Sequence, residues 1–228
     1  MRASIWALVK KDFREHATHL LGFLVVIATS QLLPLLLGPG GVVPTLSLAL
    51  LPVAFLFPMF IAYWLIGMEK AKRTLFLLRL LPLSAHHLAI AKEVVALSML
   101  LLLGAVVVVA RSLVLSLQED HEMDVLGSFG TALARWIPIV MVLLTQLALF
   151  LYLWLDYRLA GIIIVVIWYS GVFLAFFYPN ELMPLARLSE RWSFIVVGHG
   201  IAVLLVLGLH FLMVRLLERK DWDRLATG

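Results

Sequence analysis

The chain has 228 residues, of which 63% are apolar and only 14% are charged, and its mean hydropathy is +1.05. A soluble domain has about 45–50% apolar residues, and a fold of this size could not hide the excess from water. The composition therefore excludes a soluble enzyme, a disordered chain and a disulfide-stabilised secreted domain. The absence of Cys also excludes thiolate catalysis, iron–sulfur clusters and cysteine-based zinc sites.

Long apolar runs predict an all-α protein that crosses a membrane several times. A helix needs about 20 mainly apolar residues to cross roughly 30 Å of hydrocarbon. The runs are continuous, without alternating polar residues, which favours helices over a barrel. Six stretches meet the length requirement and are expected to form a single transmembrane domain: residues 19–38, 46–67, 94–117, 135–155, 159–178 and 194–217.

The Lys and Arg residues predict how these spans are oriented. If the N-terminus lies inside, the cytoplasmic segments hold fourteen of the 18 basic residues, including all six Lys. An excess of Lys and Arg near span ends marks the cytoplasmic side. Both termini are therefore expected in the cytoplasm, and the basic character reflects membrane orientation rather than nucleic-acid binding.

Residues 1–18, before the first span, show the pattern of an amphipathic helix. At 100° per residue Ile5, Trp6, Val9 and Phe13 share one face, and basic residues of the segment lie on the other. Such a helix is expected to lie flat at the inner membrane surface, either as a simple anchor or as a moving part.

Residues 68–93, here called the elbow, lie between the second and third spans and are the most informative segment. Glu69, Lys70, Lys72 and Arg73 form a charged collar before an apolar stretch, residues 75–83. Pro82 interrupts any helix in that stretch, and Ser84 can cap a new helix that leads into the third span. An apolar turn with a charged collar, exposed to the cytosol, is typical of a docking surface.

The connection at residues 118–134 is acidic and contains the dipeptide His121-Glu122. The metalloprotease pattern H-E-x-x-H is incomplete there, because Val125 occupies the position of the second His. A solvated acidic loop is therefore favoured over a metal site.

Several polar residues lie within the predicted spans, where a buried polar group is costly unless it is paired or wetted. Hydrogen bonding between packed helices is the favoured role for any one of them. His199 and His210 lie about 16 Å apart along one helix axis, too far to share a metal ion. Two side-chain amides in the predicted spans, Gln31 and Gln146, have Ser or Thr beside them. The candidates for lining a substrate path are these two residues and the Thr next to the second: Gln31, Thr145 and Gln146.

The elbow resembles a motif of the type-2 permease subunits of ATP-binding-cassette (ABC) transporters. That motif has Glu, basic residues, Thr-Leu, several Leu, Leu-Pro-hydrophobic-Ser and a Lys that opens the third span. Residues 8–15 resemble the family's amphipathic connecting helix, and residues 219–221 resemble its charged tail. Arg73 stands where the family has Gly, and no acidic residue follows Leu75. The matching elbow residues are Glu69, Lys72, Thr74, Leu75, Leu81, Pro82, Leu83, Ser84 and Lys92.

The resemblance implies the permease subunit of an ATP-driven exporter in the cytoplasmic (inner) membrane of a prokaryote. No G-x-x-x-x-G-K-[ST] motif occurs in the chain, so ATP and Mg²⁺ are expected on a separate ATPase subunit, with no catalytic residue, cofactor or metal here. Two permease copies, identical or paralogous, would surround a central path. The residues expected to couple to the ATPase are Glu69, Lys70, Lys72, Arg73, Thr74, Leu75, Leu81, Pro82, Leu83 and Ser84.

Three alternatives belong to other functional classes. An intramembrane enzyme would need a convergent nucleophile, base and oxyanion donors, yet the chain has no G-x-S-x-G motif and no pair of intramembrane carboxylates. An ion-coupled secondary transporter should have intramembrane acidic residues, which the predicted spans lack. A non-transporting anchor subunit of a larger complex stays open, and stimulation of ATP hydrolysis by substrate would separate it from a pump.

Overall fold

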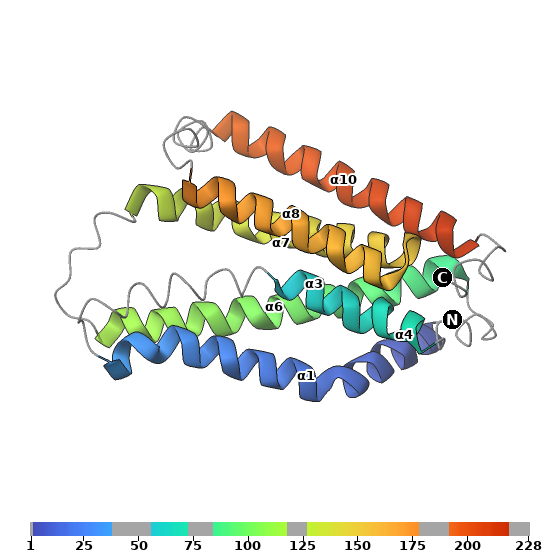
Figure 1. Cartoon of the computed structure of the whole chain (residues 1–228), viewed down its shortest axis with the longest axis horizontal. Helices are drawn as coiled ribbons and strands as arrows, with labels where there is room; N and C mark the ends of the chain where they lie inside the picture. Colours follow the sequence, from blue (N-terminus) through green and yellow to red (C-terminus); the bar gives the residue numbers. More distant parts are fainter. Residues whose placement is uncertain (1, 38–55, 73–83, 118–126, 178–191, 219–228) are drawn as a thin grey trace.

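The computed structural model describes residues 2–37, 56–72, 84–117, 127–177 and 192–218. All regular structure in these ranges is helical, and apart from Leu56 and Leu155 the described part of each predicted span lies on a helix (Figure 1). The all-α class is therefore confirmed. The helices are α1 (Arg2–Leu37), α3 (Phe57–Ala62), η1 (Tyr63–Gly67), α4 (Met68–Ala71), α6 (Ala85–Leu117), α7 (Gly127–Trp154), α8 (Tyr157–Phe177) and α10 (Trp192–Glu218).

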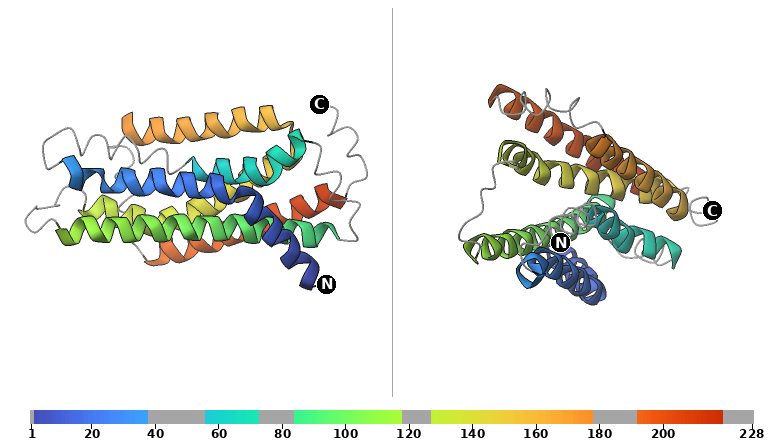
Figure 2. Two further views of the ribbon diagram at one scale, coloured as in Figure 1. Left: turned by 90° about the horizontal axis from the view of Figure 1, so that it is seen from below. Right: turned by 60° about the vertical axis from the view of Figure 1, so that its left-hand side comes forward.

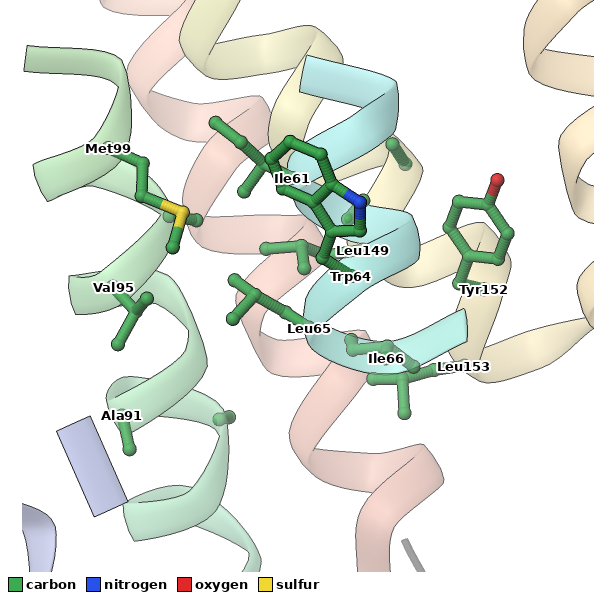
Figure 3. Close-up of a cluster of buried hydrophobic side chains, with 14 of the residues drawn as sticks. Ile61, Trp64, Leu65, Ile66, Ala91, Val95, Met99, Leu149, Tyr152 and Leu153 are labelled. Atoms are coloured by element: carbon green, nitrogen blue, oxygen red, sulfur yellow. The ribbon is translucent and has the colours of Figure 1, made fainter. Parts of the chain in front are cut away.

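The helices form a bundle around one apolar core. α1 packs along α6, the α3–η1 segment packs against α6 and α7, α8 packs against α7, and α10 packs against both α7 and α6. Leu65 of η1, Val95 of α6 and Leu149 of α7 belong to one cluster of buried apolar side chains (Figure 3). All three side chains are fully buried, and their cluster joins helices that are far apart in the sequence.

Large apolar side chains also cover the outside of the bundle, which is the reverse of the usual arrangement in soluble proteins. Leu101 of α6, Ile162 of α8 and Leu204 of α10 are each more than 60% exposed. Two helical segments, Ala85–Ala110 and Trp192–Glu218, are long and apolar enough to cross a membrane by length and composition. The expected membrane location is thus supported for these two helices.

One end of the bundle gathers the segments that were predicted to share the cytoplasmic side. The beginning of α1, α4, the beginning of α6 and the end of α10 all lie there (Figure 1). Ion pairs between α1, α4 and α6, and between α6 and α10, confirm that these segments are neighbours. We refer to this end of the bundle below as the charged end.

The predicted amphipathic helix is not a separate element. Residues 2–18 are the first half of α1, which runs without a break to Leu37 and is bent in the views of Figure 2. Ile5, Val9 and Phe13 pack against the apolar core as part of the inward face. Trp6 was predicted to share this apolar face, but it is 67% exposed. The buried face of α1 therefore does not include Trp6.

A π-helical turn, η1, interrupts the second predicted span. Such a turn holds one extra residue, so the residues that follow it are rotated by about 100° relative to an uninterrupted α-helix. Gly67 ends the turn, and a Cβ there would lie 2.7 Å from the Tyr63 ring and 3.2 Å from the Tyr152 ring. Glycine therefore allows α7 to approach this turn closely, just before Glu69.

Candidate functional site

Three ionisable side chains meet at the charged end and are almost completely buried. Asp12 on α1, Glu69 on α4 and Lys92 on α6 are 1%, 2% and 3% exposed. The Lys92 ammonium lies 2.9 Å from Asp12 Oδ2 and 2.8 Å from Glu69 Oε1. One cation thus joins three helices, and we call this set the buried charge cluster.

Lys11 supplies a second cation at the edge of the buried charge cluster. Its ammonium lies 3.0 Å from Glu69 Oε1 and 3.5 Å from Asp12 Oδ1, and it also pairs with Glu15 at 3.4 Å. Burial lowers the pKa of Lys11, but the surrounding carboxylates, Glu69 foremost, outweigh burial and raise it. Lys11 and Lys92 together therefore balance the charges of Asp12 and Glu69.

His16 lies one turn after Asp12 on the same face of α1 and is 1% exposed. Neither ring nitrogen forms a hydrogen bond within the part of the chain that the structure describes. Burial is the main cause that lowers the pKa of His16, because a charged imidazolium would lose its hydration there. His16 is therefore neutral at pH 7 and adds no charge to the buried charge cluster.

Asp12, Glu15 and Glu69 place three carboxylate oxygens within 4.8 Å of one another, a separation that a metal ion could bridge. The ammonium of Lys11 already lies within 3.5 Å of all three residues. These residues therefore form an ion-pair network, in which lysine ammonium groups occupy the positions that a metal ion would need.

Lys70 connects the start of the elbow to α7. Its ammonium donates hydrogen bonds to the carbonyl oxygens of Tyr152 at 3.3 Å, Leu153 at 3.4 Å and Leu155. The Tyr152 and Leu153 carbonyls belong to the last turn of α7, where helical carbonyls have no partner within the helix, and Leu155 directly follows the end of α7. Burial lowers the pKa of Lys70. The cation stabilises the negative end of the α7 dipole as well as its free acceptors.

The charged collar predicted for the elbow is only partly exposed. Lys72, the C-cap residue of α4, is exposed as expected. Glu69 is buried and Lys70 is half-buried, so both contact their own chain rather than solvent. The π-helical turn explains this difference, because it rotates α4 relative to a regular continuation of α3.

Ser84 caps α6 as predicted. Its hydroxyl oxygen accepts a hydrogen bond from the His87 backbone N–H at 3.3 Å and lies 2.5 Å from the His87 ring. The other elbow residues of the predicted docking surface lie outside the described residues: Arg73, Thr74, Leu75, Leu81, Pro82 and Leu83.

The structure describes the side chains of two of the three substrate-path candidates, Thr145 and Gln146. The Thr145 hydroxyl donates to the Met141 carbonyl of its own helix at 2.8 Å. Gln146 is buried, and its Oε1 accepts no hydrogen bond from the described residues. The Gln31 side chain lies outside the described residues. The pocket next to them, lined by Leu144 and Leu147 among others, is apolar, and its ≈ 20 Å³ would hold about one water molecule.

The sequence analysis did not predict that three residues of this site are buried close together: Asp12, His16 and Lys92. One signal was present, since Asp12 and His16 follow Leu8 at four-residue spacing and continue toward Leu20 on one apolar face. An acidic residue inside such a face requires a buried partner. The identity of that partner, 80 residues away, is not encoded in local spacing.

Comparison with known proteins gave no match among family models, curated proteins or solved structures.

Proposed function

We propose that this chain is the membrane-spanning permease subunit of an ATP-driven exporter of the type-2 ABC class, with six transmembrane helices and both termini in the cytoplasm. A separate subunit carries ATP and Mg²⁺, and two permease copies form the path. The observation that carries the proposal is the attachment of the elbow. Glu69 at its start pairs with Lys92 at its end, and Lys92 also pairs with Asp12 of α1. Lys70, next to Glu69, donates hydrogen bonds to carbonyls in the last turn of α7.

This attachment suits a part that transmits force. A push on the elbow cannot move α4 away from α1 and α6 without separating Lys92 from Asp12 or Glu69. Separated charges in a site with under 5% exposure would be left without water, which costs several kcal/mol. The three helices therefore move with the elbow as one body, whereas an exposed and loosely held loop would bend.

The exposed apolar helices support the membrane part of the proposal. Side chains such as Val196, Leu204 and Phe211 of α10 are more than half exposed along the helix. Lipid or a second permease copy would cover them.

The test is coupling to an ATPase. The neighbouring reading frames are first searched for an ATPase, the parent is co-expressed with the candidate found, and both co-purification and ATP hydrolysis in nanodiscs are measured. Leu81→Ala combined with Leu83→Ala should weaken capture by roughly 2 kcal/mol or more, because buried anchors dominate docking. Lys72→Glu combined with Arg73→Glu should weaken capture most at low salt.

Lys10→Glu is the matched control, since Lys10 is an exposed lysine on α1 outside the elbow. The control should retain the ATPase at the parental level. If the elbow variants and the control behave alike, the elbow is not the coupling element and the proposal fails. If the ATPase is held but its turnover never responds to substrate, the chain is an anchor subunit instead.

A further inference from the structure

A second polar group lies at the charged end, between α6 and α10, and the permease proposal does not use it. His210 of α10 faces Glu93 and His86 of α6. His210 Nδ1 lies 2.8 Å from both carboxylate oxygens of Glu93, and His210 Nε2 lies 3.3 Å from His86 Nδ1. Glu93 and His210 are partly buried, and His86 is exposed.

The carboxylate fixes the tautomer of His210. An ionised Glu accepts hydrogen bonds and donates none, so Nδ1 of His210 must carry the proton that it shares with Glu93. In the neutral ring Nε2 is then a lone-pair donor, and it faces the ring nitrogen of His86. In metal-binding histidines, the ring nitrogen that does not bind the metal usually donates a hydrogen bond to a group such as a carboxylate.

The distance between His210 Nε2 and His86 Nδ1 also fits the binding of one metal ion by both rings. Two imidazole nitrogens bound to one tetrahedral Zn²⁺, each at about 2.0–2.1 Å, lie about 3.3–3.4 Å apart. His210 Nε2 and His86 Nδ1 are 3.3 Å apart. Their rings are nearly perpendicular, with centroids 5.2 Å apart, so the two nitrogens meet near one point without stacking of the rings.

We propose that His86 and His210 bind a divalent transition-metal ion of the Zn²⁺ type, with Glu93 as the positioning residue that orients His210. The exposure of His86 leaves the site open to solvent, and water fills the remaining coordination positions. Neutral imidazole is a ligand that such ions prefer to the oxygen ligands of Mg²⁺ and Ca²⁺.

The ion would join the first turn of α6 to α10. His86 lies two residues after Ser84, at the end of the elbow, whereas Lys92 faces α1 and α4 from another side of α6. The metal site and the buried charge cluster are thus separate contacts of the same helix. With the ion bound, α10 is connected to the helix on which the elbow ends.

Zn²⁺ alone is the probe. The full-length protein is purified without an oligohistidine tag, and binding is measured by isothermal titration calorimetry, with Co²⁺ absorption reporting tetrahedral geometry. We expect one ion per chain. His86→Ala should abolish binding, and because His86 is exposed this substitution removes no core packing. Glu93→Gln should weaken binding about 10–100-fold, as loss of an outer-shell carboxylate does in other metal sites.

His19→Ala is the matched control, because His19 is also an exposed histidine on a helix of the same bundle and faces Trp64. Binding by the His19→Ala protein should equal that of the parent. The proposal is overturned if His86→Ala binds Zn²⁺ as the parent does. It is also overturned if the parent binds less than one ion per chain, in which case His86 and His210 form only a hydrogen bond.

Discussion

Replacing Lys92 by Met tests whether the buried charge cluster holds α1, α4 and α6 together. The change keeps most of the length of the unbranched side chain and removes the ammonium that lies 2.9 Å from Asp12 and 2.8 Å from Glu69. Both carboxylates have under 5% exposure, so water cannot replace the lost cation. Removing one partner of a buried ion pair costs about 3–5 kcal/mol. Lys11 stays within 3.0 Å of Glu69, which places the expected loss near the lower limit of that range.

The measurement is thermal unfolding of the purified protein in detergent, followed by intrinsic fluorescence. For a chain of this length each 1 kcal/mol changes Tm by roughly 2–4 °C, so we expect Lys92→Met to lower Tm by about 6–12 °C. Glu15→Gln removes the exposed Lys11–Glu15 pair, worth about 0–1 kcal/mol, and is the control. Asp12→Asn in the Lys92→Met background should recover part of the loss. A Tm for Lys92→Met equal to that of the control would refute the reasoning.

Two further predictions concern close packing and orientation. Gly67→Ala should destabilise the protein by about 1–3 kcal/mol, because its Cβ would lie against two tyrosine rings. Gly22→Ala, in a helical position with nothing within 4 Å, should leave Tm unchanged or raise it, and equal shifts for the two would contradict the π-helical contact. In intact cells, Cys at Ser84 should resist an impermeant thiol reagent, whereas Cys at Ser128 should react. The chain has no native Cys, and labelling at Ser84 would refute the orientation.

The helices were predictable because each is encoded by a local property of the sequence. A run of about 20 apolar residues lowers the free energy of one conformation, and α7, α8 and α10 begin and end within a few residues of the expected spans or extend them by about two turns. The cap at Ser84 was equally local. The break within the second span was not, since no single residue type specifies the π-helical turn from Tyr63 to Gly67.

The charge contacts could not be predicted for a related reason. Lys92 and Asp12 are 80 residues apart, and Glu93 and His210 are 117 residues apart. Spacing along the chain indicates the face of a helix on which a side chain lies, but not which helix packs against it. Lys70 shows the difficulty most clearly, because the exposed surface cation expected from sequence is a partly buried cap on α7.

The elbow is attached to the bundle through the buried charge cluster and through Lys70. The residues that these two attachments contact are synthesised at different times. All members of the buried charge cluster lie among the first 92 residues, so a nascent chain can neutralise Asp12 and Glu69 as soon as the first part of α6 has been made. The carbonyls that Lys70 contacts lie at the end of α7 and directly after it, and they are translated more than 80 residues later. Folding that proceeds from the N-terminus would therefore close the contact among α1, α4 and α6 first. Until α7 packs against α4, the Lys70 ammonium lacks its carbonyl partners, so its burial marks the joining of the N-terminal and C-terminal parts of the bundle.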